Sequence, residues 1–305
     1  MRAAIRARGV DRLISLTAVE VDKRLRLGAL GKDFALRELP FNAVIVRAHV
    51  LYKIKADDRD TCRIAAMGDQ LPPLPSADTF AAVVGEGPKV LAIAAMQAHC
   101  QFRAEVFLMS DADVVGGFLH IPLNSPVPMY LLLPDNLPHP LAGRYLLIQH
   151  AIYGLRESNR LFSLEMTRVI TKVAGYVSTQ GDSQLFVKAD KVDPGYICIA
   201  SVTVDDVLIL TNSASMRQEL LDALASRFGP LTINMESAMH AGVEFTRLPS
   251  GGVLLTQDRA IARAASVVGV SHLSPVALPG DGRLFFALVA EECVPVDSTV
   301  YSSLW

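Results

Sequence analysis

The stretch that most restricts how this chain can fold is ASVTVDDVLIL, residues 200–210, where two adjacent aspartates interrupt an apolar run. The apolar residues on either side, within 196–211, predict a β-hairpin with Asp205 and Asp206 at its tip. Taking a carboxylate out of water without a partner costs several kcal/mol, or the group becomes protonated. The two charges therefore need compensation, either by a metal ion or, if they merely form a turn, by water.

Composition limits the class of protein. The chain has 305 residues, of which 51% are hydrophobic and 20% charged, which is typical of a globular protein with one large domain or two modest ones. No apolar run is long enough for a membrane span, and the first residues lack the apolar segment of a signal peptide. The four cysteines are scattered without metal-ligand spacing, so we expect an intracellular protein with reduced thiols and no structural zinc.

Charge is distributed unevenly along the chain. Residues 1–60 hold 13 Lys and Arg against 8 Asp and Glu, whereas the remainder holds 16 against 23, so a local charge of +5 precedes one of −7. A basic part facing an acidic part would suit a phosphate-bearing ligand held against a metal. Ordinary variation in surface charge is the alternative explanation.

Helical periodicity and strand-like alternation are mixed along the sequence. Helices are expected over 89–100, 155–175, 213–228 and 258–269, and a second hairpin over 242–257. In the helix over 155–175, Phe162, Met166, Ile170 and Val173 are expected to share a buried face. In the next helix, Ser215 and Gln218 have the spacing of a capping box. Mixed helices and hairpins favour an α+β fold over a doubly wound parallel sheet.

A third aspartate completes a plausible ligand set. Asp113 lies in SDADVVGGFL, a predicted strand followed by a glycine pair. Hard divalent cations such as Mg²⁺ prefer carboxylate oxygens, and carboxylates converging from neighbouring strands can hold two ions for phosphoryl transfer. The sequence therefore predicts a site formed by Asp113, Asp205 and Asp206.

Several segments resemble a known family. VTVDDVLILTNS resembles the YVDD hairpin of reverse transcriptases, and DVVGGFLH (113–120) resembles the DVKTAFLNG strand of copia-type (pseudovirus-class) LTR retrotransposons. Seven further segments follow in the family's order: RIAAMGDQ (63–70), DTFAAVV (78–84), MYLLLP (129–134), IYGLRESNRLF (152–162), DSQLFVK (182–188), AGVEF (241–245) and GGVLLTQ (251–257). Their collinear order between residues 50 and 257 identifies a resemblance to a copia-type reverse transcriptase domain.

This resemblance implies an α+β right-hand polymerase fold, with fingers and palm over residues 1–257 and a partial thumb with an unassigned tail over 258–305. It implies an RNA-directed DNA polymerase in which Asp113, Asp205 and Asp206 bind two Mg²⁺ (or Mn²⁺) ions. The expected partners are an RNA or DNA template with its primer and a deoxynucleoside triphosphate (dNTP). The expected location is intracellular, in the cytoplasm, a virus-like particle or the nucleus.

The resemblance also assigns nucleotide-binding positions. Gly116 and Gly117 would lie beneath the incoming triphosphate, and Arg63 matches the arginine of the fingers that contacts it. Phe118 falls at the aromatic position that excludes a ribose 2′-hydroxyl, although such a ring also suits core packing. Glu157 occupies the position of a family glutamine near the substrate.

The chain departs from the family pattern at two substrate-facing positions. Thr203 replaces the tyrosine of the YVDD hairpin, and Glu157 places a negative charge where an anionic substrate is expected. No segment resembles the RNase H or integrase regions of a polyprotein. A catalytically decayed relic, or a nucleic-acid-binding module on a polymerase fold, is therefore the alternative. A different metal-dependent phosphotransferase or nuclease is the more remote one.

Overall fold

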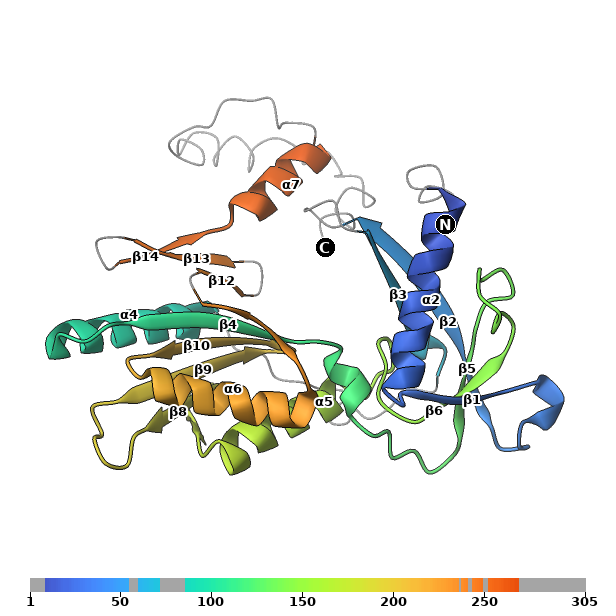
Figure 1. Cartoon of the computed structure of the whole chain (residues 1–305), viewed down its shortest axis with the longest axis horizontal. Helices are drawn as coiled ribbons and strands as arrows, with labels where there is room; N and C mark the ends of the chain where they lie inside the picture. The colour runs from blue at the N-terminus through green and yellow to red at the C-terminus, as the bar shows by residue number, and fades with distance from the viewer. Residues whose placement is uncertain are drawn as a thin grey trace, which may run out of the picture. The chain divides into compact units, whose positions relative to one another are not determined.

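The computed structural model describes residues 9–54, 60–71, 86–235, 237–240, 243–248 and 252–268 (Figure 1). The chain divides into two compact units, Met1–Glu236 and Ser237–Trp305. The domain boundary predicted after residue 257 falls within the second unit and stays a prediction.

The first unit contains two sheets. The N-terminal five-stranded sheet has the order β1-β6-β5-β2-β3, and its strands are antiparallel except for the parallel pair β2–β5. Its elements are helix α2 (Val10–Arg26), β1 (Leu30–Phe34), β2 (Val44–Ile54), β3 (Asp60–Ala66), β5 (Met129–Leu132) and β6 (Tyr145–Ile148), with short 3₁₀ helices at Leu36–Glu38 and Gly68–Gln70. Helix α2 buries Leu13, Thr17, Val21 and Arg24.

The second sheet carries the three aspartates. Its six strands are antiparallel, in the order β11-β4-β10-β9-β8-β7. They are β4 (Leu108–Val114), β7 (Val177–Ser178), β8 (Leu185–Ala189), β9 (Ile197–Thr203), β10 (Asp206–Thr211) and β11 (Leu231–Asn234). Three helices accompany them, α4 (Glu86–Arg103), α5 (Ser158–Arg168) and α6 (Ala214–Phe228), and a 3₁₀ turn η3 (Gly117–His120) follows β4. The predicted hairpin over 196–211 is confirmed as β9 and β10.

The two faces of this sheet are covered differently (Figure 1). Ala112, Val114, Val207 and Ile209 pack in one apolar cluster with the buried residues of α5 and α6. Because side chains alternate along a strand, the neighbouring residues of β4 and β10 point to the opposite face, where α4 lies. The acidic residues of these strands, Asp111, Asp113 and Asp206, all lie at positions on that opposite face. Packing of the apolar cluster against α5 and α6 therefore holds the strands that carry them in place.

The helix predicted over 155–175 is confirmed as α5 and the π-helical segment that continues it to Val173, but the expected burial of Val173 is wrong. Phe162, Met166 and Ile170 are fully buried as expected, but Val173 is 59% exposed. The reason is a π-helical segment over Val169–Val173, which widens the last turn. Val169 and Ile170 are both buried, and Val173 is rotated out to solvent.

The predicted cap of the following helix is also wrong. Helix α6 begins at Ala214, and its N-cap is Ser213, whose side chain accepts a hydrogen bond from the Met216 amide at 3.4 Å. Ser215 lies inside the first turn instead, where its hydroxyl contacts that of Ser213 at 2.9 Å. Two serines two residues apart offer alternative caps, and packing of the helix selects between them.

The second unit contains a three-stranded antiparallel sheet in the order β12-β13-β14. Its strands are β12 (Ser237–His240), β13 (Val243–Arg247) and β14 (Val253–Thr256), and helix α7 (Asp258–Val268) follows. The predicted hairpin over 242–257 and the last predicted helix are confirmed. Among the described residues, no helix is both long and apolar enough to cross a membrane.

The predicted α+β class is therefore confirmed, with an antiparallel sheet flanked by helices in the part predicted as the palm. The cysteines described here, Cys62, Cys100 and Cys198, are free thiols. The segment DTFAAVV (78–84), which contributes to the family resemblance, lies outside the described residues.

Candidate functional site

Strand register brings the three aspartates together. In the β4–β10 ladder, Asp113 lies directly opposite Asp206, and Asp205 occupies the tight turn between β9 and β10. One carboxylate oxygen from each of the three aspartates lies within 4.8 Å of the other two. Oxygen atoms at this separation can share hard divalent cations, so the geometry suits the predicted metal site.

The negative charges of this cluster are unfavourable as they stand, and a bound cation would stabilise them. Burial, followed by the negative charges of Asp111, Asp205 and Asp113, raises the pKa of Asp206 to about 7. Burial also raises the pKa of Asp205, which Arg63 partly offsets. Carboxylates held this close disfavour one another's ionised form, and a bound cation would relieve that repulsion.

The turn that presents Asp205 is conformationally unusual. Val204 has φ 57, in the left-handed region that β-branched residues avoid. Such strain is found where surrounding structure fixes a functional turn. Beside it, the Thr203 hydroxyl is buried without a hydrogen-bond partner, so the residue that replaces the family's tyrosine leaves its polar group unused.

A row of side chains in cation–π and edge-to-face contact runs from the first sheet to the second. The Arg63 guanidinium on β3 lies 4.7 Å above the centre of the Tyr153 ring. Tyr153 packs edge-to-face on Phe118 at 4.8 Å, and Phe118 on Phe162 at 5.5 Å. A backbone hydrogen bond of 2.7 Å from Ala66 to Tyr153 holds β3 beside this row. Arg63 is thereby kept within electrostatic reach of Asp205.

Phe118 is almost entirely covered by this packing, being 6% exposed, and belongs to the apolar cluster of the second sheet. The ring is thus held rigidly by Tyr153 and Phe162. Its assignment to nucleotide selection stays a prediction, and its contribution to the core is established by its contacts.

The glycine pair forms the bend between β4 and η3. Gly116 has φ 72, which glycine adopts without strain. At Gly117, a Cβ atom would lie 2.7 Å from the Phe162 ring, so any larger residue would displace that ring. The bend follows Asp113 by three residues, and both of its glycines are buried.

Glu157 lies apart from the aspartates along the chain, at the N-cap of α5. It lines a pocket of about 390 Å³ together with Arg156, Arg160 and apolar residues of the first unit. Its Oε2 atom is buried without a hydrogen-bond partner. No contact joins Glu157 to the aspartates in the part of the chain that the structure describes, so its predicted role at the nucleotide remains a prediction.

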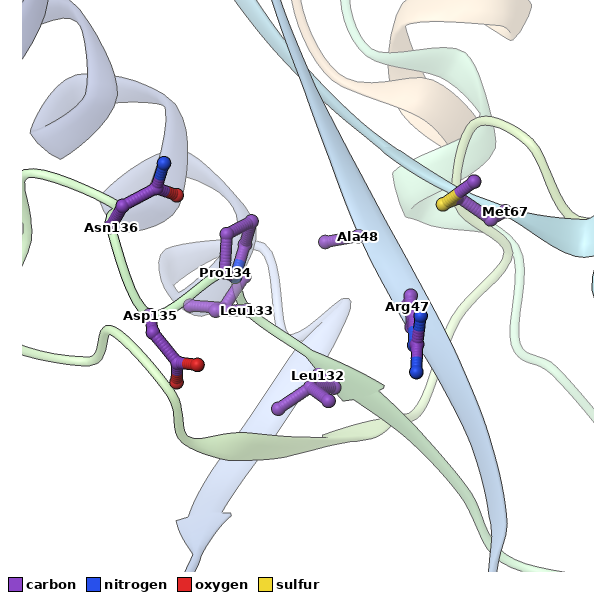
Figure 2. Close-up of a pocket in the computed structure, with 8 residues that line it drawn as sticks. All are labelled: Arg47, Ala48, Met67, Leu132, Leu133, Pro134, Asp135 and Asn136. Carbon is purple, nitrogen blue, oxygen red and sulfur yellow. The ribbon is translucent and has the colours of Figure 1, made fainter.

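A second pocket, of about 430 Å³, lies on the first sheet. Figure 2 shows Arg47 and Ala48 on β2, with residues 132–136 at the end of β5 across from them. None of the predicted site residues is among those described as lining it. This pocket therefore adds nothing to the predicted chemistry.

Sequence reasoning missed three contributors to the site. Asp111, two residues before Asp113 and on the same side of β4, adds a fourth negative charge near Asp206. Tyr153 connects Arg63 to Phe118. Val204 carries the strained turn. The period of a strand could have indicated Asp111, whereas the other two depend on long-range packing.

Comparison with known proteins agrees with the resemblance. No family model matches the chain. Over 227 residues, 73% of its length, the chain is 26% identical to the retrovirus-related Pol polyprotein from transposon RE1 of Arabidopsis thaliana, of which it covers 14%.

Two solved structures are also similar. One is a foamy viral protease–reverse transcriptase in complex with double-stranded DNA, with 13% identity, coverage of 84% of this chain and 36% of that chain, and a TM-score of 0.44. The other is telomerase from Candida albicans in complex with a fragment of telomeric RNA, with 8% identity, coverage of 79% and 49%, and a TM-score of 0.47. The sequence match confirms the predicted resemblance: along most of its length, this chain is similar to a short part of a retrotransposon Pol polyprotein.

Proposed function

We propose that this chain is the polymerase segment of a copia-type retrotransposon polyprotein and that it transfers a nucleotide from a dNTP to a primer 3′-hydroxyl on an RNA template. The observation that carries the proposal is the convergence of Asp113, Asp205 and Asp206 from paired strands, with oxygens within 4.8 Å. Similarity to a transposon Pol polyprotein over 227 residues supports it.

The residues of the cluster fit two Mg²⁺ or Mn²⁺ ions. All three candidate ligands are carboxylates, the donors that hard divalent cations prefer. Burial and the mutual repulsion of the carboxylates, which together raise the pKa of Asp206, support a cationic occupant. When bound, such a pair stabilises the charge on the attacking and leaving oxygens of an in-line displacement.

The other side chains would bind and orient the substrates. Arg63 would contact the triphosphate through its guanidinium, which Tyr153 supports from one side. The backbone at Gly116 and Gly117 would lie under the phosphates. Phe118, fixed between two aromatic rings, would exclude a 2′-hydroxyl and so favour deoxynucleotides.

The wider context follows from the same proposal. Residues 1–257 would form fingers and palm, and the residues from 258 onward the beginning of a thumb. The partners would be a primed RNA or DNA template and the RNase H and integrase regions of a polyprotein. The chain would act inside the cell, in the cytoplasm, a virus-like particle or the nucleus.

Primer extension tests the proposal. The purified chain should extend a DNA primer on an RNA template with Mg²⁺ or Mn²⁺ and not with EDTA. Asp205→Asn should reduce the rate by roughly 10³-fold or more, because it removes a charge that positions both ions. Asp222→Asn, at an exposed position of α6, is the matched control and should extend normally. Undiminished extension by Asp205→Asn would refute the assignment.

A second candidate function is binding of nucleic acid without catalysis. It is favoured by Glu157, whose charge replaces a neutral amide and whose Oε2 has no hydrogen-bond partner. It predicts salt-sensitive binding to an RNA–DNA hybrid and no extension. Glu157→Gln separates the two functions. If the chain is a polymerase, relief of the repulsion between Glu157 and the substrate should raise primer extension by roughly tenfold. If the chain only binds nucleic acid, the variant should also show no extension. Robust extension by the unaltered chain would exclude this second function.

A further inference from the structure

Helix α2 places two consecutive cations beside the candidate site. Arg24 is completely buried, pairs with Glu20 at 2.7 Å and donates a hydrogen bond to the Ile64 carbonyl. Ile64 follows Arg63 in β3. The last turn of α2 is therefore anchored to the strand that carries Arg63. Because Lys23 is next to Arg24, this anchor also fixes the position of the Lys23 backbone.

The Lys23 side chain extends over the bend that follows β4. A Cβ atom on Gly116 would lie 3.1 Å from both Cε and Nζ of Lys23. The ammonium group is thus in close contact with the backbone three residues beyond Asp113. Helix α2 reaches this bend from a part of the sequence about 90 residues away.

Lys23 has no anionic partner in the part of the chain that the structure describes. It is half-buried and belongs to no ion pair or hydrogen bond found there. By contrast, Lys188 on β8 pairs with Glu219 at 2.9 Å. Positive charge is instead concentrated near Lys23: burial lowers the pKa of His120, and Arg227 and Lys23 lower it further. An ammonium in such surroundings gains from an anionic ligand.

Lys23 and Arg63 approach the candidate site from different elements. Arg63 is within electrostatic reach of Asp205, whereas Lys23 lies on Gly116. The hydrogen bond from Arg24 to Ile64 links their two elements directly. A phosphate chain extending from the aspartates along the bend would therefore meet a cation at each end.

We propose that Lys23 binds the terminal phosphates of the incoming nucleoside triphosphate over Gly116, so that helix α2 contributes directly to nucleotide binding. This inference rests on the proposed function. A lysine suits the role because its ammonium acts as a compact point charge on a flexible stem.

Equilibrium binding tests the inference without chemistry. The chain is bound to a primer–template whose primer ends in a dideoxynucleotide, and the dissociation constants of Mg²⁺–dTTP and Mg²⁺–dTMP are measured. Lys23→Gln should weaken dTTP binding by about tenfold, with little effect on dTMP, because the terminal phosphates are absent there. Lys23→Arg should retain most of the affinity. Arg26→Gln, at an exposed position of the same helix turn, is the matched control and should bind as the unaltered chain does.

The outcomes separate this inference from the proposed function. Equal dTTP affinity for Lys23→Gln and the unaltered chain overturns the role of Lys23, even if the chain extends primers. Failure of the unaltered chain to bind dTTP overturns it as well. Binding of dTTP that depends on Lys23, together with no extension of an unblocked primer, supports the role of Lys23 and refutes the polymerase function. Thermal unfolding of each variant verifies that the helix remains packed.

Discussion

The six-stranded sheet carries an apolar cluster on one face and an acidic cluster at the end of the other, and the two have opposite physical character. On the face toward α5 and α6, side chains such as Val207 and Ile209 are fully buried in an apolar cluster. The other face carries Asp113 and Asp206, whose charges repel one another at close range. The face toward α5 and α6 therefore stabilises the fold, and so do the fully buried Leu208 and Leu210 on the other face. The aspartates at the end of that other face lower the stability in return for a site that can hold cations. Changes in the apolar cluster and changes at the aspartates should have opposite effects on stability.

The largest effect is expected on the apolar face. Phe162 is fully buried, with its ring against Phe118 and Phe228. Phe162→Ala should lower the free energy of unfolding by about 3–5 kcal/mol, because it leaves a cavity in the core. Denaturant unfolding measures this. Leu164→Ala, on the same helix but 53% exposed, should change stability by less than about 0.5 kcal/mol. A similar loss in both variants would contradict the assignment of the buried face.

The opposite sign is expected on the acidic face. Asp206→Asn should raise the free energy of unfolding by about 1 kcal/mol at pH 8 without metal, after allowance for screening by water. The physical reason is that a neutral amide avoids the cost of burying a charge and also removes the repulsion from Asp111, Asp205 and Asp113. With Mg²⁺ added, the unaltered chain should gain stability and the variant should gain less. Destabilisation by Asp206→Asn in the absence of metal would contradict the comparison.

A smaller, pH-dependent effect is expected at the edge of the apolar face. Glu165 on α5 accepts hydrogen bonds from Arg168 at 2.7 and 3.0 Å and from Arg227 on α6. The hydrogen bonds from Arg168, followed by the one from Arg227, lower the pKa of Glu165 from 4.5 to about 2. Because the pKa is lower in the folded state, the stabilisation is present above about pH 4.5 and is lost as the pH falls toward 2.

Glu165→Gln should therefore lose about 0.5–1 kcal/mol at pH 7, since surface screening weakens these pairs. The difference from the unaltered chain should shrink between pH 4.5 and 2 in acid-denaturation curves. Lys188→Gln, which removes an exposed pair with Glu219, serves as a comparison. A difference that persists unchanged to pH 2 would show that Glu165 acts through packing alone.

Much of the fold could be predicted because the relevant signals are local. Apolar runs on both sides of Asp205 and Asp206 predicted β9 and β10, and helical periodicity predicted α4, α5 and α6. The exposure of Val173 could not be predicted, because a π-helical widening depends on how the last turn packs against neighbouring elements. The N-cap of α6 could not be chosen between two serines for a similar reason.

The sequence by itself determined which side chains could form a metal site, since aspartates stand out chemically in an apolar hairpin and the period of a strand fixes the face on which they lie. It also determined the resemblance to a retrotransposon polymerase, because that depends on the order of short motifs. Only the tertiary structure decided that Asp113 lies opposite Asp206, that Tyr153 supports Arg63, and that Lys23 lies on Gly116. These contacts join residues distant in the chain, and strand register and helix packing, which arise from the whole core, determine them.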